Sequence, residues 1–310
     1  MAIKVLVPGP LTTVQDIGRF GYQQFGMPCS GVMDPEAYKK ANRLVGNEKG
    51  EAVLEFTLLG GMYLFDQDAL IALSGADMDP TVNGTPVPMN RPLLVKAGST
   101  LFLGPARSGC RTYLAAAGGI LVPSVMGSRS TNLKCGIGGF EGRALQKGDV
   151  LMLSPQNPNA PNTIAADLER NLEGQTECPS EFPAHPVYPS CITLRVIEGP
   201  QADYFTEKGL YTFYSGIYTM TEENDRMGCR MDGPSIESIH GTDIISDGIV
   251  FGSIQVTPAG LPIVLMADRQ TTGGYAKIAT VCYSDLPLLA QCRPGASIRF
   301  QKMDFDGSFD

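Results

Sequence analysis

Residues 261–281 read LPIVLMADRQTTGGYAKIATV and show the alternation of apolar and polar segments on which the fold depends. The apolar run 262–267 predicts a buried strand, and residues 279–282 predict the next one. Five consecutive polar residues, 268–272, follow the first strand. We expect Gly273 and Gly274 to let the backbone turn sharply after them, because glycine tolerates conformations that other residues avoid.

Apolar runs of the same kind recur along the whole chain, separated by many of its 36 glycines and 23 prolines. Short strands with this punctuation are typical of β-barrels and β-sandwiches, so the predicted fold class is mainly β. The other predicted strands are residues 3–7, 69–73, 93–95, 100–103, 111–116, 150–153, 192–197, 248–257 and 297–300.

Helices are expected to be few and short. The clearest runs from Pro35 to about Val45, because Asp34 is a good N-cap, proline fits the first turn and Gly46 suits the C-terminal stop. A second short helix is predicted over residues 200–209, with Ala202 and Phe205 facing inward.

The domain organisation follows from one proline-rich stretch. Residues 154–190 contain seven prolines and little periodic apolar pattern, which predicts an extended connection, with a short helix at 166–172. This connection separates an N-terminal domain, 1–153, from a C-terminal domain, 191–302, and residues 303–310 form a polar tail.

Composition and charge exclude several classes of protein. A chain of 310 residues with 43% hydrophobic and 18% charged residues can build ordinary globular cores. Its net charge of −8 disfavours nucleic acid as a partner. No apolar stretch approaches the ~20 residues of a membrane span, and the start, MAIKVLVPGP, is too short for a signal-peptide core. The predicted location is therefore the cytoplasm.

Histidine and cysteine usage restricts the possible chemistry. There are only two histidines, His185 in the proline-rich stretch and His240, so a catalytic triad or a histidine-rich metal site is not expected. The eight cysteines include no C-x-x-C pair, and we expect them to be small buried residues rather than disulfides or metal ligands.

The densest polar cluster lies in the opening stretch, at the end of the predicted strand 262–267. Polar side chains at a strand end are a common way to present a binding site. The same pattern also fits a hydrogen-bonded turn that ties two strands together. The candidate residues of this cluster are Asp268, Arg269, Gln270, Thr271, Gly273, Gly274, Tyr275 and Lys277.

Three further clusters are candidates. In residues 221–233, Asp225, Arg226 and Arg230 could bind a carboxylate or phosphoryl group through the arginine forks, or could form a surface loop with internal ion pairs. Near the N-terminus, residues 12–26 bring Asp16, Gly18, Arg19 and Tyr22 into one glycine-rich loop, for which a packing role is favoured over a functional one. The fourth cluster is GSRSTN at 127–132, which contains Arg129, Ser130 and Thr131 and precedes GIGGFEGR at 136–143.

Standard nucleotide motifs are missing from the sequence. The phosphate-binding pattern G-x-x-x-x-G-K-[ST] does not occur, and GRALQKGD at 142–149 has the wrong order. The dinucleotide pattern G-x-G-x-x-G is also absent. A site for ATP must therefore be of another kind or involve a partner protein.

Five blocks of the sequence resemble the family of 5-oxoprolinase C subunits, also called the KipA or allophanate hydrolase subunit 2-like family. The blocks are GPLTTVQDIGRFGYQQFGMPCSGVMDPEAYKKANRLVGN, RTYLAAAGGILVPSVMGSRSTNL, GRALQKGD, NDRMGCRM and SIQVTPAGLPIVLMADRQTTGGYAKIATV. They cover nearly the whole chain in register. The resemblance implies two cyclophilin-like β-barrel domains, and a relation to the carboxyltransferase region of urea carboxylase.

The resemblance also implies an activity, the ATP-dependent opening of the 5-oxoproline lactam to glutamate. The expected partners are a KipI-like B subunit and a LamB/YcsF-like A subunit, with ATP and Mg²⁺ bound by this chain or with a partner. An amide is a poor electrophile, so a phosphoryl group placed on the lactam oxygen would turn that oxygen into a leaving group. Charged and amide side chains would stabilise the developing charge. Asp268 and Tyr275 are then candidate proton acceptors, Lys277 and Arg226 candidate catalytic cations, and the substrate-binding set is Asp225, Gln255, Arg269, Gln270, Thr271, Gly273 and Gly274.

Two alternatives stay open at this point. One is a biotin-dependent carboxyltransferase acting on urea or a small amide, and since the chain has no A-M-K-M motif, biotin would have to arrive on another protein. The other is a non-catalytic KipA-like regulator that antagonises a KipI-type kinase inhibitor. Under all three hypotheses no nucleic acid or membrane partner is expected.

Overall fold

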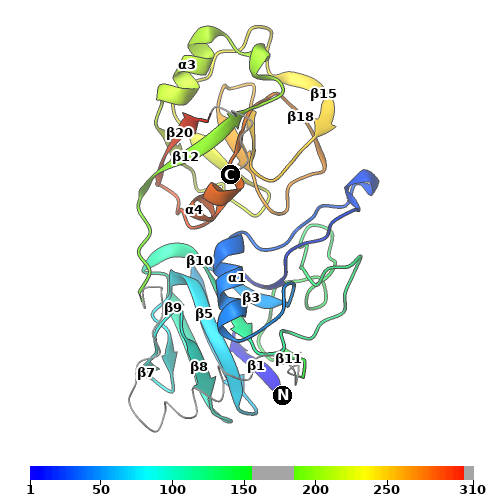
Figure 1. Ribbon diagram of the computed structural model, residues 1–310, viewed down its shortest axis with the longest axis vertical. Helices are drawn as coiled ribbons and strands as arrows, with labels where there is room; N and C mark the ends of the chain where they lie inside the picture. The colour runs from blue at the N-terminus through cyan, green and yellow to red at the C-terminus, as the bar shows by residue number, and fades with distance from the viewer. Residues whose placement is uncertain (156–184, 304–310) are drawn as a thin grey trace. The chain divides into compact units, whose positions relative to one another are not determined.

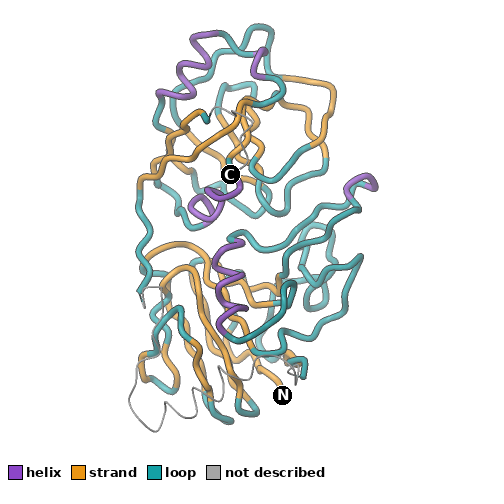
Figure 2. Tube along the Cα trace, viewed as in Figure 1, coloured by secondary structure: helices purple, strands orange, loops and turns teal. Residues whose placement is uncertain are grey.

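The computed structural model describes residues 1–155 and 185–303 as a mainly β protein with few, short helices (Figures 1 and 2). The chain forms two compact units: unit 1 is Met1–Arg19 and Ser30–Tyr188, and unit 2 is Phe20–Cys29 and Pro189–Asp310. The sequence pattern places residues 20–29 with the first half, whereas in the structure they belong to unit 2. The predicted helix at 166–172 lies outside the described residues.

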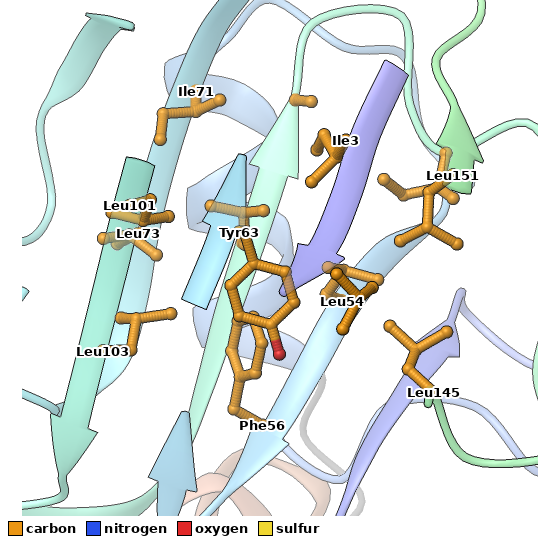
Figure 3. Close-up of a cluster of buried hydrophobic side chains, with 14 of the residues drawn as sticks. Ile3, Leu54, Phe56, Tyr63, Ile71, Leu73, Leu101, Leu103, Leu145 and Leu151 are labelled. Carbon is orange, nitrogen blue, oxygen red and sulfur yellow. The ribbon is translucent and has the colours of Figure 1, made fainter. Parts of the chain in front are cut away.

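Unit 1 is built from two antiparallel sheets that enclose one hydrophobic core. The first has six strands, in the order β11 (Val150–Met152), β1 (Ala2–Val7), β4 (Leu59–Phe65), β9 (Thr100–Pro105), β6 (Thr81–Val82) and β7 (Thr85–Pro86). The second has five, in the order β2 (Thr12–Gln15), β3 (Val53–Thr57), β10 (Ser108–Ala116), β5 (Ala69–Asp77) and β8 (Pro92–Val95). Figure 3 shows side chains from both sheets meeting in the core, among them Ile3, Tyr63 and Leu101 from the first and Leu54 and Ile71 from the second.

Helix α1 (Pro35–Leu44) covers the other face of the five-stranded sheet. Since side chains alternate along a strand, Ile71 and Leu73 of β5 enter the core between the sheets while Leu70 and Ala72 face the helix. The predicted N-cap is confirmed: the carboxylate of Asp34 accepts hydrogen bonds from the amides of Glu36 at 3.1 Å and Ala37 at 2.9 Å.

Unit 2 contains a closed seven-stranded barrel. Its strands follow the order β12 (Cys191–Glu198), β19 (Lys277–Val281), β16 (Ser253–Val256), β17 (Pro262–Leu265), β14 (Gly228–Asp232), β13 (Tyr218–Met220) and β20 (Ser297–Lys302), and β20 closes the ring by pairing in parallel with β12. A separate two-stranded sheet joins β15 (Asp243–Gly248) to β18 (Thr272–Tyr275). Phe213 stacks on Phe300 inside the unit, with ring centroids 4.6 Å apart.

The short helices of unit 2 differ in part from the prediction. The helix predicted over 200–209 is wrong: a 3₁₀ turn, η2 (Ala202–Tyr204), is followed by α3 (Glu207–Ser215), whose N-cap is the Thr206 hydroxyl, bonded to the amide of Gly209 at 2.9 Å. This N-cap determines where α3 begins, because the Thr206 hydroxyl accepts a hydrogen bond from a first-turn amide that would otherwise be unpaired. Ala202 and Phe205 are buried, as expected. The remaining short helices are η1 (Gln23–Phe25), η3 (Tyr283–Asp285) and α4 (Leu286–Ala290).

One strand prediction and one turn prediction also need correction. The single strand expected at 248–257 is interrupted, because Gly248 ends β15 and the chain turns at Gly252, with φ of +90°, before β16 begins. Gly273 and Gly274 do not form the expected sharp turn: both lie within β18, and neither has a positive φ.

The described residues add two general observations. All seven cysteines among them are free thiols; Cys29, Cys110, Cys229 and Cys292 are buried as expected, whereas the expectation is wrong for Cys135 and Cys191, which are exposed, and Cys282 is partly exposed. Within the described ranges, no helix combines the length and apolar character needed to cross a membrane.

Candidate functional site

A pocket of about 240 Å³ opens on the barrel of unit 2. Strands β14, β16, β17 and β18 contribute to its wall, together with the segment that precedes β14 and the residues that follow β17. Its lining residues are Asp225, Met227, Gly228, Arg230, Gln255, Ile263, Leu265, Arg269, Gln270 and Tyr275. The pocket therefore combines residues from two of the sequence clusters.

The segment that precedes β14 is shaped by Asp225. Its Oδ1 accepts hydrogen bonds from the amides of Met227 at 2.7 Å and Gly228 at 3.0 Å. Aspartate at such a position mimics a backbone turn, which is a local reason for the sequence to fold this way. The carboxylate is held in place by these amides at the pocket wall.

Arg269 is the buried cation of the pocket. Its side chain is 8% exposed, lies over the ring of Phe251 at 5.5 Å, and donates from one terminal nitrogen to the carbonyl of Met266 at 3.3 Å. The other terminal nitrogen lies 4.0 Å from the thiol of Cys29, and Nε has no partner among the described residues. Burial lowers the pKa of Arg269, because it disfavours the charged guanidinium.

Gln255 and Tyr275 supply the polar groups beside this cation. Gln255 comes from β16, is 6% exposed, and donates from Nε2 to the backbone carbonyl of Tyr275 at 3.2 Å. A Cβ at Gly273 would lie 2.5 Å from that Nε2, so the glycine is what allows β18 to approach the Gln255 side chain.

Arg226 and Asp268 are brought together, but away from the pocket wall. Arg226 donates from Nε to Oδ2 of Asp268 at 2.9 Å and from a terminal nitrogen to Oδ1 at 3.2 Å. Both side chains are almost fully buried, and neither lines the pocket. The expected clamp formed by Arg226 therefore does not face the pocket, because its guanidinium is paired with a neighbouring carboxylate.

Lys277 is also placed elsewhere than expected. Its ammonium group donates to the carboxylate of Asp247 and, at 2.8 Å, to the carbonyl of Gly248. Lys277 does not line the pocket, so the four proposed catalytic residues do not converge there; of these only Tyr275 is in the lining. The hydrogen bond from Lys277 lowers the pKa of Asp247.

Sequence reasoning missed part of the pocket wall. The sequence clusters contain Arg230, Met227 and Gly228 but do not assign them to the site, and the sequence pattern identifies Ile263 and Leu265 only as part of a strand. These two residues are two positions apart on β17, so the period of a strand places them on one face. That periodicity was a usable signal. Thr271, Gly273 and Gly274 are not among the lining residues.

The residues of the secondary cluster meet in unit 1. Asp16 is 4% exposed and accepts hydrogen bonds from the amide of Arg129 at 2.6 Å and from the hydroxyls of Ser128 at 2.7 Å and Ser130 at 2.5 Å. Arg19 is fully buried and donates to the carbonyls of Val125 and Ser130, each at 3.0 Å. These bonds tie the N-terminal loop to the segment around residue 130.

The other members of this cluster have structural partners as well. Thr131 donates to the carbonyl of Val14 at 2.9 Å, and Arg129 lies 3.3 Å from the carboxylate of Glu51. A mainly apolar hollow of about 450 Å³ also opens on unit 1, beside the glycine-rich loop 136–142, but none of the secondary-cluster residues lines it. Among the described residues no group of three or more histidine, cysteine or acidic side chains could hold a metal ion.

Comparison with known proteins assigns a family. Residues 25–302 match the family described as carboxyltransferase domain, subdomain A and B. The 5-oxoprolinase C subunit of Haemophilus influenzae is 36% identical over 289 residues, 93% of this chain and 87% of that protein. The 5-oxoprolinase C subunit of Escherichia coli is 36% identical over 298 residues, 96% of this chain and 90% of that protein. The chain belongs to the carboxyltransferase domain family.

Two solved structures with more than 30% sequence identity to this chain agree with its fold. The Kluyveromyces lactis urea carboxylase matches with a TM-score of 0.85 and 32% identity, over 98% of this chain but 27% of that one. The protein TTHA0988 matches with a TM-score of 0.82 and 35% identity, over 97% of this chain and 55% of that one. This carboxyltransferase domain chain thus corresponds to one part of these longer proteins.

The unit 2 pocket of this carboxyltransferase domain protein suits a small polar ligand. Its volume lies below the ~300–1,000 Å³ of pockets for drug-sized molecules. Two guanidinium groups, two amide side chains, a phenol and one carboxylate surround it, with Ile263 and Leu265 as the apolar wall. This arrangement can orient a compact molecule through hydrogen bonds and stabilise negative charge on it.

Proposed function

We propose that this chain is the C subunit of an ATP-dependent 5-oxoprolinase, which opens the 5-oxoproline lactam to L-glutamate. The observation that carries the proposal is the match with two proteins named as 5-oxoprolinase C subunits, which extends over 87% and 90% of their length. By contrast, the chain covers only 17% of the urea amidolyase of Saccharomyces cerevisiae, at 32% identity. Since both 5-oxoprolinase relatives are named as one subunit among several, their names further support a multi-subunit enzyme.

The unit 2 pocket is the proposed lactam site. Gln255 and Gln270 provide amides that can pair with the ring N–H and C=O of a lactam, and Tyr275 provides a hydroxyl beside them. The wall of Ile263 and Leu265 suits the methylene groups of the ring. In this proposal these residues bind and orient the lactam, and Tyr275 is the candidate proton acceptor of the pocket.

ATP is assigned to the assembled complex rather than to this pocket. A volume of about 240 Å³ is too small for a whole nucleotide alongside a lactam, and the sequence contains no phosphate-binding loop. We therefore propose that ATP, with Mg²⁺, binds with the KipI-like B subunit, and that a LamB/YcsF-like A subunit completes the enzyme. In this proposal no residue of this chain binds the nucleotide or acts on it.

Reconstitution tests the proposal. The purified chain is assayed alone and after co-purification with a KipI-like and a LamB/YcsF-like protein, with ATP hydrolysis and glutamate formation measured separately. We expect negligible turnover by the chain alone and 5-oxoproline-stimulated turnover by the complex. Strong turnover by the isolated chain, or a stable complex that is inert with 5-oxoproline, would contradict it.

Carboxyl transfer is the second candidate function. It is favoured by the family description and by the relatives named urea amidolyase and putative urea carboxylase. In that case a biotinylated partner would deliver the carboxyl group, and the amide side chains of the pocket would bind urea or a small amide. Stimulation of turnover by an added biotin-carrying protein, with urea preferred over 5-oxoproline, would select this function. A complex that forms without either activity would instead favour the regulatory role.

A further inference from the structure

The unit 2 pocket has an excess of positive charge at its wall. Arg269 and Arg230 line it together with one acid, Asp225, whose Oδ1 is already bonded to two backbone amides. Arg230 is about half exposed, and its ion-pair partner, Glu223, is 3.9 Å away and itself 81% exposed. Such a long, exposed ion pair contributes little to stability, so the charge of Arg230 remains available to a ligand.

Arg269 is the residue that most strongly indicates an anionic ligand, because it is buried and forms no ion pair among the described residues. The adjacent carboxylate, Asp268, is engaged by both hydrogen bonds from Arg226. The contacts of Arg269 are a carbonyl, a thiol and an aromatic face, and its Nε donates to nothing in the described chain. A buried cation is costly unless an opposite charge accompanies it, and a guanidinium matches a carboxylate through a bidentate fork.

We propose that this pocket recognises a small lactam or amide through a carboxylate attached to it, with Arg269 as the anchor and Arg230 at the mouth as the second cation. The amide side chain of Gln255 lies at the same wall, and its carbonyl oxygen accepts no hydrogen bond within the described residues. The ligand class is therefore a compact molecule with a carboxylate beside an N–H and C=O. This inference rests on the proposed function for the choice of 5-oxoproline as probe.

Calorimetric titration of the full-length chain tests the anchor. The probes are 5-oxoproline, which has the lactam and the carboxylate, 2-pyrrolidinone, which has the lactam alone, and acetate, which has the carboxylate alone. We expect 5-oxoproline to bind about ten- to a hundredfold more tightly than 2-pyrrolidinone, as a charge-assisted hydrogen bond predicts. Equal affinities for these two, or acetate binding as tightly as 5-oxoproline, would overturn the inference.

Substitutions test which residues cause the preference for 5-oxoproline over 2-pyrrolidinone. Arg269→Gln should reduce the affinity ratio of 5-oxoproline to 2-pyrrolidinone toward one, and Arg269→Lys should restore part of it. Since Arg269 is buried and its variants can lose stability, Arg230→Gln at the exposed mouth is the second variant, expected to lower the ratio severalfold. Arg299→Gln, at an exposed position of β20 outside the pocket lining, is the matched control and should leave the ratio unchanged. An unchanged ratio in both Arg269→Gln and Arg230→Gln would refute the assignment.

The outcome is separable from that of the proposed function. The chain could prefer ligands with a carboxylate although its reconstituted complex does not turn over 5-oxoproline. That result would support the pocket inference and refute the proposed enzyme function. Conversely, the complex could turn over 5-oxoproline at a rate that neither Arg269→Gln nor Arg230→Gln changes. That result would support the proposed enzyme function and refute the pocket inference.

Discussion

The guanidinium of Arg226 and the carboxylate of Asp268 form a two-bond ion pair, with distances of 2.9 and 3.2 Å, inside unit 2. Both side chains are more than nine-tenths buried. Asp268 immediately precedes Arg269, and its amide donates to the carbonyl of Arg226 at 2.7 Å. The pair thus fixes the backbone from which the pocket cation extends, while taking no part in the pocket wall itself.

Breaking this pair should cost stability. Arg226→Ala removes the ion-pair partner of the buried Asp268 carboxylate, and Asp268→Ala removes the carboxylate that the buried Arg226 guanidinium binds, so a loss of about 3–5 kcal/mol in the free energy of unfolding is expected. Urea denaturation measures it. The double variant Arg226→Met/Asp268→Leu removes both charges and should lose less than the sum of the single variants. Single variants with wild-type stability and impaired ligand affinity would show instead that the pair acts as a ligand clamp.

Gly273→Ala should disturb the pocket. The new Cβ would lie 2.5 Å from Nε2 of Gln255 and 2.6 Å from Cδ1 of Ile249, so these side chains must shift. We expect weaker 5-oxoproline binding by calorimetry, with only a modest fall in melting temperature, because the backbone of Gly273 is not in the left-handed region. Gly274→Ala is the control: its nearest neighbour would be the Ile244 carbonyl at an ordinary 3.6 Å. Equal effects of the two substitutions would count against this explanation.

Asp285 should make stability depend on acid pH. Hydrogen bonds from Arg195 lower the pKa of this carboxyl in the folded chain, with Nε at 3.0 Å from Oδ2. The stabilisation is therefore full above the pKa of the unfolded chain, ordinarily ~3.9, and is lost as pH falls through the lower folded pKa. Arg195→Gln should be less stable than wild type near neutral pH, and the difference in melting temperature should shrink as the solution is acidified. A difference that stays constant with pH would exclude this linkage.

Asp16 should be structural in unit 1. Asp16→Ala removes the acceptor for the Arg129 amide and two serine hydroxyls, and leaving such buried donors unpaired should cost at least about 1–3 kcal/mol of unfolding free energy. Asp68→Ala is the control, since its ion pair with Lys96 is exposed and screened by solvent, so its loss should change the stability little. Ligand affinity in unit 2 should be unaffected by either. A stable Asp16→Ala chain with reduced activity in the reconstituted complex would point to a functional cluster.

Local sequence patterns predicted those features of the structure that depend on interactions within a few residues. The Asp34–Pro35 start of α1 and about half of the strands follow from capping, backbone restriction and side-chain alternation within a few residues, whereas strands such as β2, β3, β4, β13 and β14 were not predicted. The polar clusters around residues 225 and 270 were also visible, and five pocket residues are among those that the sequence predicts for the site: Asp225, Gln255, Arg269, Gln270 and Tyr275.

Only the tertiary structure decided which of these side chains meet. Closure of the barrel pairs β14 with β17, and this pairing sets Arg226 against Asp268 while Arg269, one residue later, lines the pocket. Neighbours in sequence thus have opposite roles, because a side chain's direction depends on which partner strand lies beside it. The meeting of Asp16 with Ser128 and Ser130, more than a hundred residues away, and the membership of residues 20–29 in unit 2 depend on the same long-range contacts, which no local pattern encodes.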